Sequence, residues 1–93
     1  MEENKLELHA IFYGNVQGIG FRYTVTDLAR ELGVVGTVKN LPNGNVEMCA
    51  QGPKAKLEKL CAEIQSEFKD NIQSMDVSYA PIKSALTGFH IMR

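Results

Sequence analysis

Two stretches of this chain place apolar residues at helical spacing along a single side, and they constrain its fold more than any other feature. The first stripe consists of Phe21, Val25, Leu28, Ala29 and Leu32. The second consists of Leu57, Leu60, Cys61, Ile64 and Phe68. A helix with one apolar side buries that side against another element. Gly33 predicts the end of the first helix, and Pro53 predicts a second helix with proline at its first position, ending near Lys69.

The segments around these stripes are typical of strands with one buried face. They cover residues 6–12, 34–41, 46–50, 75–79 and 89–91. Between the second and third of them, Pro42-Asn43-Gly44 predicts a tight hairpin turn. The order is therefore strand, helix, strand, strand, helix, strand and a short terminal strand. We expect an α+β fold, the ferredoxin-like split βαβ sandwich, with one antiparallel or mixed sheet and both helices on one face.

Length and composition set limits on the function. At 93 residues, we expect a single domain spanning residues 1–93. Ten basic and eleven acidic residues give a formal net charge of −1, which argues against a nucleic-acid or anionic membrane partner. No apolar run reaches the roughly 20 residues of a membrane helix. Cys49 and Cys61 lack C-x-x-C spacing and indicate reduced core thiols. We expect a cytoplasmic monomer whose partner is a small molecule.

Residues 14–22, with the sequence GNVQGIGFR, connect the first strand to the first helix and carry a candidate anion site. Glycines at positions 14, 18 and 20 permit positive φ and let the backbone approach a ligand closely. Free N–H groups and the positive end of the helix dipole then converge on one spot. Arg22 adds a guanidinium that matches phosphate geometry. The backbone contacts expected for phosphate come from Asn15, Val16, Gln17, Gly18, Ile19, Gly20 and Phe21.

Together with LGVVGTVKNLPNGNVE at residues 32–47, this loop resembles the acylphosphatase family. The family pattern combines Val-Gln-Gly-Val/Ile, x-Phe-Arg, Gly-x-Val and an Asn ahead of a Gly-x-Val-Glu hairpin. The resemblance covers residues 8–52 and, more loosely, residues 89–91. It implies the same ferredoxin-like sandwich and hydrolysis of carboxyl-phosphate anhydrides without a metal or cofactor. It also implies that Arg22 and Asn40 are the catalytic pair.

The chemistry implied by this resemblance fits these residue types. An acyl phosphate already carries a good leaving group, a carboxylate, so positioning and charge neutralisation can suffice. The loop amides and Arg22 would hold the phosphoryl oxygens, and Asn40 would orient the attacking water. A carboxamide is too weak a base to remove the proton of that water. The resemblance implies that a phosphate oxygen of the substrate accepts it.

Several other interpretations of these residues remain open. An arginine at a helix start is often only a solvated charge, and Asn40 could simply begin the hairpin turn. The loop could also belong to a non-catalytic phosphate-binding or regulatory domain of the same fold, although such a domain has no need of a water-orienting amide. Tyr23 is expected to be a packing or surface residue. The side chains of Asn15 and Gln17 are expected to bond backbone rather than ligand.

Three further classes of site fit the sequence poorly. The loop lacks the Gly-Lys-Ser/Thr ending of a nucleotide P-loop and the third glycine of a dinucleotide-binding motif. An RNA-binding sheet would need exposed aromatic residues and a basic surface, whereas this chain has seven aromatic residues and a negative net charge. His9 and His90 lie on predicted strands without other ligands at metal-binding spacing, so we expect no metal site.

Overall fold

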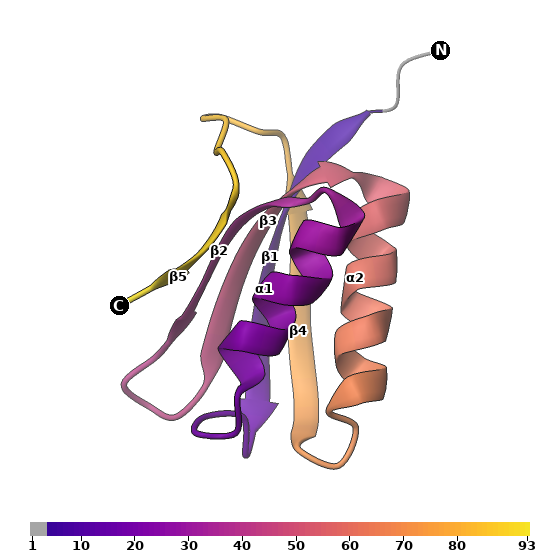
Figure 1. The fold of residues 1–93 in the computed structure, drawn as a ribbon. Helices are drawn as coiled ribbons and strands as arrows, with labels where there is room; N and C mark the ends of the chain where they lie inside the picture. Colours follow the sequence, from indigo (N-terminus) through magenta and orange to yellow (C-terminus); the bar gives the residue numbers. More distant parts are fainter. Residues whose placement is uncertain (1–3) are drawn as a thin grey trace.

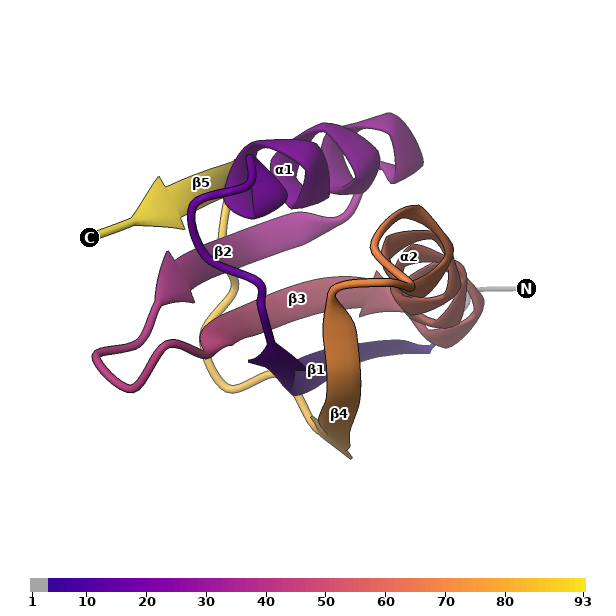
Figure 2. The same cartoon turned by 90° about the horizontal axis from the view of Figure 1, so that it is seen from below.

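The computed structural model describes residues 4–93, which form one sheet covered on one face by two helices (Figures 1 and 2). The elements in chain order are β1 (Lys5–Gly14), α1 (Phe21–Leu32), β2 (Val35–Asn40), β3 (Val46–Pro53), α2 (Lys54–Glu67), β4 (Ile72–Ala80) and β5 (Phe89–Met92). This order and the placement of both helices on one face confirm the predicted arrangement.

The sheet topology is that of a split βαβ sandwich. Its five strands lie in the order β4-β1-β3-β2-β5. Strand β1 pairs antiparallel with β3 and β4, β2 pairs antiparallel with β3, and β5 runs parallel to β2. Strands β1 and β2 therefore run in the same direction with β3 between them, and α1 connects them across the sheet. Helix α2 connects β3 to β4 in the same way, with β1 between these two strands. Because β5 is parallel to β2 and the other pairs are antiparallel, the sheet is mixed, as predicted.

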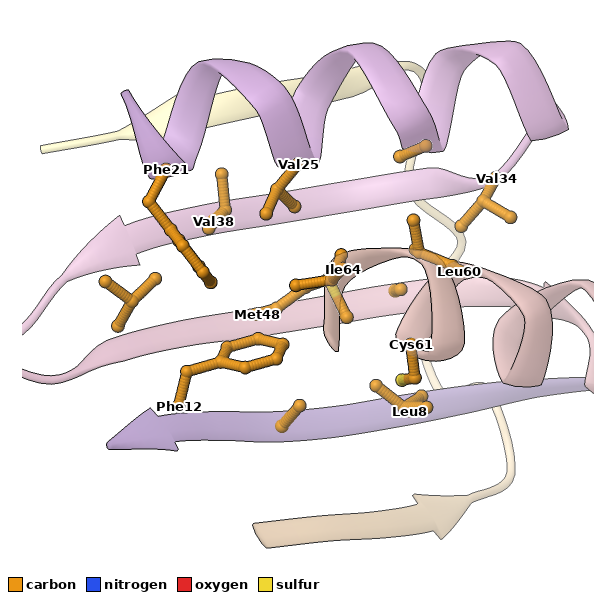
Figure 3. Close-up of a cluster of buried hydrophobic side chains, with 14 of the residues drawn as sticks. Leu8, Phe12, Phe21, Val25, Val34, Val38, Met48, Leu60, Cys61 and Ile64 are labelled. Atoms are coloured by element: carbon orange, nitrogen blue, oxygen red, sulfur yellow. The ribbon is translucent and has the colours of Figure 1, made fainter. Parts of the chain in front are cut away.

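The core lies between the helices and the sheet face that they cover (Figure 3). Alternation along β1 sends Leu8, Ala10 and Phe12 into this layer, where all three are fully buried. The Phe21 ring, at the start of α1, lies with its centroid 5.2 Å from that of Phe12 and 4.7 Å from that of Phe68. Three aromatic rings therefore fix the start of α1 against β1 and the end of α2.

The ends of the helices follow the sequence signals with one correction. Gly33 has φ +72°, and the N–H groups of Gly33 and Val34 donate to the carbonyls of Arg30 and Ala29, a Schellman motif that ends α1 as predicted. Proline was expected at the first position of α2, but Pro53 has ψ 141° and is the N-cap. It still pairs with Lys5 at the end of β3, so its backbone stays extended.

The connection between β2 and β3 is a hairpin, as predicted, but not a two-residue turn. The φ of Asn43 is negative and that of Gly44 is +94°. Gly44 N–H donates to the Leu41 carbonyl at 3.1 Å, and Leu41 N–H donates to the Asn45 carbonyl at 2.8 Å. These bonds enclose a loop of three residues in which glycine takes the left-handed position.

The two cysteines lie in different surroundings. Cys61 is buried under α2, which confirms it as a core thiol, whereas Cys49 is only half-buried. The alternation of β3 explains this difference, because Met48 and Ala50 face the helices and Cys49 therefore faces the uncovered side of the sheet. The prediction of a core position for Cys49 was wrong, while both cysteines are free, as expected.

Candidate active site

The connection from β1 to α1 starts with a close approach between two backbones. Gly14 has φ +129°, and a Cβ built on it would lie 2.3 Å from the Asn71 carbonyl oxygen and 2.8 Å from the Gln73 nitrogen. The next residue, Asn15, donates its N–H to the same Asn71 oxygen at 2.9 Å. Glycine is therefore required at position 14 for space as well as for conformation. This contact fixes the start of the loop to the connection between α2 and β4.

Two further glycines shape the tip of the loop. Gly18 has φ +77° and Gly20 has φ +78°, and a Cβ at either position would meet no atom within 4 Å. Glycine is favoured at these positions because left-handed backbone is costly for other residues. Gly20 is also the N-cap of α1, where no side chain caps the helix and the first turn carries no acidic residue. The amide groups of this helix start are therefore left without a capping side chain.

A small pocket lies where this loop faces the end of β2. Its volume is about 80 Å³, and it is lined by Val16, Gly18, Gly20, Phe21, Arg22, Tyr23 and Asn40. Figure 1 shows why these residues meet, since the β1–α1 connection and the β2–β3 hairpin lie at the same end of the sandwich. Arg22 and Asn40, the two residues expected to form the catalytic pair, both line this pocket. Asn15, Gln17 and Ile19 belong to the loop but do not line the pocket.

Two apolar side chains hold the loop in this shape. Val16 is fully buried and Phe21 is 2% exposed, so both ends of the glycine-rich tip are fixed in the core. The tip between them is exposed at Gly18, Ile19 and Gly20. The loop is therefore anchored at both ends by buried side chains, while its glycine-rich tip stays accessible to an anion.

Asn40 contributes a polar atom that the protein leaves unsatisfied. It is the last residue of β2, pairs with Val46 and lies on the same face as the buried Val38. Its Oδ1 is buried and has no hydrogen-bond partner among residues 4–93. Most buried polar atoms in proteins are hydrogen-bonded, so an exception that lines a pocket requires an explanation. The obvious explanation is a ligand or reacting group bound next to this oxygen.

Arg22 supplies the positive charge of the pocket. It lies in the first turn of α1, is half-buried, and its carbonyl accepts a hydrogen bond of 2.8 Å from the Thr26 hydroxyl. Within residues 4–93, no acidic side chain forms an ion pair with it. A cation at a helix start is disfavoured by the helix dipole. The guanidinium is therefore available to an anion that would also interact favourably with the dipole.

Gln17 links the loop to the hairpin that follows Asn40. Its Nε2 donates to the carbonyls of Leu41 and Asn45, both at 2.8 Å. The sequence led us to expect a bond from Gln17 to the backbone of the loop; both partners are backbone carbonyls, but they belong to the hairpin and not to the loop. They lie 24 and 28 residues away along the chain. No local sequence signal could have identified them, because the spacing is set by the fold.

Other polar clusters in the described part of the chain lack the features of this pocket. A larger depression of about 220 Å³ lies between the end of α2 and the start of β4, with Lys69 as its only charged lining residue. His9 contacts the Glu47 carboxylate at 2.7 Å, and the His90 ring lies 3.0 Å from the Thr87 carbonyl. Among residues 4–93, no three His, Cys, Asp or Glu side chains are placed to share a metal ion. The smaller pocket is therefore the candidate active site, since it combines a cation, a glycine-rich loop and a buried oxygen without a partner among residues 4–93.

Both thiols are held in their protonated form. Burial, and secondarily the charge of Glu58, raises the pKa of Cys61 to about 11. Burial and the neighbouring Glu7 also raise the pKa of Cys49. A reactive cysteine has a lowered pKa, so neither thiol has the character of a nucleophile.

None of the helices within residues 4–93 combines the length and apolar character needed to cross a bilayer.

The chain and its fold match proteins of one family. A sequence profile described as acylphosphatase matches residues 8–91. Curated relatives named acylphosphatase include a protein of Vibrio parahaemolyticus, 38% identical over 88% of this chain and 91% of its own length. Another, of Archaeoglobus fulgidus, is 51% identical over 71% of this chain and 90% of its own. The crystal structure of acylphosphatase from Bacillus subtilis matches with a TM-score of 0.86 at 28% identity, over 95% of this chain and 99% of that one. The chain therefore belongs to the acylphosphatase family and is an enzyme that hydrolyses acyl phosphates.

Proposed function

We propose that the pocket between residues 15–23 and Asn40 carries out this hydrolysis without a metal ion. The observation that carries the proposal is that one small pocket pairs an arginine with a buried amide oxygen. Within the described residues 4–93, the arginine has no acidic partner and the oxygen has no hydrogen bond. The first group suits the phosphoryl anion, and the second suits a water molecule.

Phosphate binding is assigned to the backbone of residues 15–21 and to Arg22. The left-handed glycines at 18 and 20 leave amides free at the tip of the loop, and the uncapped start of α1 adds its own. Such amides and a helix start favour a negative charge. The guanidinium contributes a full charge and two donors in a plane. These groups stabilise the transition state most if they bind it more tightly than the substrate.

Water orientation is assigned to Asn40. Its Oδ1 accepts one hydrogen bond from the attacking water and thereby directs the water oxygen toward phosphorus. The bond from phosphorus to the acyl oxygen breaks as the new P–O bond forms, so the carboxylate leaves with the bonding pair. A phosphate oxygen takes the proton of the water, because the amide cannot. The products are a carboxylate and inorganic phosphate.

The charge on the phosphoryl group can be met by the protein itself in this arrangement. Arg22 and the loop amides supply the electrostatic contribution that other phosphoryl-transfer enzymes obtain partly from Mg²⁺. We therefore propose that activity persists in the presence of EDTA. Loss of hydrolysis in EDTA that returns with an added divalent cation would contradict this part of the proposal.

The experiment that tests the assignment is hydrolysis of benzoyl phosphate by wild type, Arg22→Ala and Asn40→Ala, with EDTA present. We expect Arg22→Ala to lose both phosphate binding and turnover. Asn40→Ala should keep its affinity for inorganic phosphate and lose about 10²–10³-fold in kcat, the cost of removing one positioned polar group. Near-wild-type turnover in Asn40→Ala would show that this residue does not orient water.

The alternative from another functional class is a pocket that binds anions without turnover. Such a pocket needs the amides and Arg22 but gains nothing from the unsatisfied Oδ1 of Asn40, whose burial is costly. Phosphate binding without hydrolysis in the wild-type assay would favour this alternative.

A further inference from the structure

The volume of the pocket limits which part of the substrate it can hold. One water molecule accounts for about 30 Å³ of the liquid, so a pocket of about 80 Å³ has room for a group the size of a few water molecules. A phosphoryl group with its attacking water fills such a space. With the phosphoryl group in this space, the acyl part of an acyl phosphate extends toward the exposed border of the pocket.

An exposed aromatic residue borders that opening. Tyr23 lines the pocket, follows Arg22 in the first turn of α1 and is 69% exposed. Among the large hydrophobic residues exposed within residues 4–93, none is more exposed. Ile19, 38% exposed, lies between the two pocket-lining glycines of the loop tip. Isolated exposed apolar residues are common, but these two sit on the segment that forms the phosphate site.

We infer that Tyr23 contacts the acyl group and makes the enzyme prefer acyl phosphates whose acyl group is aromatic or large and apolar. The inference rests on the proposed function, because it requires the phosphoryl group to occupy the pocket. From the sequence we expected Tyr23 to be only a packing or surface residue. The inference adds that its exposed ring contacts the acyl group of the substrate. The first helical turn fixes the backbone of Tyr23, so little order has to be gained when a planar acyl group packs against the ring.

The preference is tested by comparing benzoyl phosphate with acetyl phosphate in wild type, Tyr23→Ala and Tyr23→Phe. Loss of one aromatic contact should lower the ratio of kcat/KM for benzoyl to acetyl phosphate by about 3- to 10-fold in Tyr23→Ala. The change should arise from a higher KM for benzoyl phosphate. Tyr23→Phe should retain the wild-type ratio, since the ring and not the hydroxyl makes the contact.

Two measurements separate this role from a structural one. In Tyr23→Ala the inhibition constant of inorganic phosphate should change less than the KM of benzoyl phosphate, because inorganic phosphate has no acyl group to pack against the ring. Tyr79→Ala is the matched control, since Tyr79 is also exposed, at 38%, but lies on β4 and does not line the pocket. Its substrate ratio should equal that of wild type.

The outcomes distinguish this inference from the proposed function. If Tyr23→Ala hydrolyses both substrates with an unchanged ratio, or loses activity equally toward both, the role of Tyr23 is wrong while the proposed function stands. If wild type fails to hydrolyse either substrate in EDTA, or Asn40→Ala turns over normally, the proposed function itself fails.

Discussion

Replacing Asn40 by alanine should abolish most of the activity while leaving the protein at least as stable as before. This combination is unusual, because most substitutions of partly buried residues destabilise a protein. The reason lies in the Oδ1 of Asn40, which is buried and makes no hydrogen bond. A residue kept for function at the expense of stability behaves in this way.

The size of the effect follows from that unsatisfied oxygen. A buried polar group without a partner costs about 1–3 kcal/mol of stability. Asn40→Ala removes this cost and sacrifices no hydrogen bond of Oδ1, so the free energy of unfolding should stay constant or rise by up to that amount. For a domain of this size each kcal/mol corresponds to about 4–8 °C in Tm. Turnover should fall by about 10²–10³-fold at the same time.

Asn43→Ala provides a matched control in the same hairpin. Its Oδ1 accepts a hydrogen bond of 3.1 Å from the Asn45 N–H and lies in an exposed turn. Removing this bond should destabilise the protein by about 0.5–1.5 kcal/mol and leave turnover unchanged. The two asparagines should thus show opposite patterns of stability and activity.

The assay measures urea unfolding and benzoyl phosphate turnover on the same preparations of wild type and both variants. The reasoning is refuted if Asn40→Ala is less stable than wild type, because Oδ1 would then make a stabilising contact. It is also refuted if Asn40→Ala is more stable yet fully active.

Three further predictions concern the loop and the core. Gln17→Met removes two hydrogen bonds of 2.8 Å, so urea unfolding should show a free energy of unfolding lower by about 1–3 kcal/mol, and kcat should fall as well. If stability and kcat were both unchanged, the bonds between loop and hairpin would have no role in the site. Gly14→Ala places a Cβ 2.3 Å from a carbonyl oxygen, whereas the Cβ of Gly18→Ala meets open space and should cost only about 1–2 kcal/mol for its left-handed backbone. Gly14→Ala should therefore be the more destabilised variant. Equal losses of stability in urea unfolding would contradict the close approach at Gly14. Burial raises the folded-state pKa of Cys61 from 9.0 to about 11, so the contribution of this thiol to stability is complete below pH 9 and is lost as the pH rises to about 11. Wild type should therefore lose stability relative to Cys61→Ala over that interval. Parallel curves of unfolding free energy against pH for the two proteins would be the contrary result.

Much of the fold could be predicted because its signals are local. The apolar stripe beginning at Phe21 and the glycine at 33 define α1 without reference to the rest of the chain. Alternation in β1 identifies the residues that reach the core. Helix-capping details were less predictable, since Pro53 remains paired with Lys5 and the strand therefore continues to the proline.

The candidate site was only partly predictable. Arg22 and the glycines could be proposed from the loop sequence itself. Asn40 could be proposed only because the segment around it resembles the acylphosphatase pattern. The bonds from Gln17 to the hairpin and from Asn15 to Asn71 could not be, because they join segments that only the folded topology brings together. The position of Tyr23 at the mouth of the pocket depends on the same topology, since no feature of the sequence around it indicates what lies opposite.

The contact between Asn15 and Asn71 also determines when the enzyme becomes competent during synthesis. A nascent chain that has emerged through residue 45 already contains Arg22, Asn40 and the hairpin carbonyls that Gln17 bonds, but the start of its loop lacks the Asn71 partner until residue 71 follows. A chain that ends before residue 71 therefore lacks the contact that fixes the start of the loop. Catalysis should therefore appear only once the chain extends beyond residue 71, when both halves of the chain have joined.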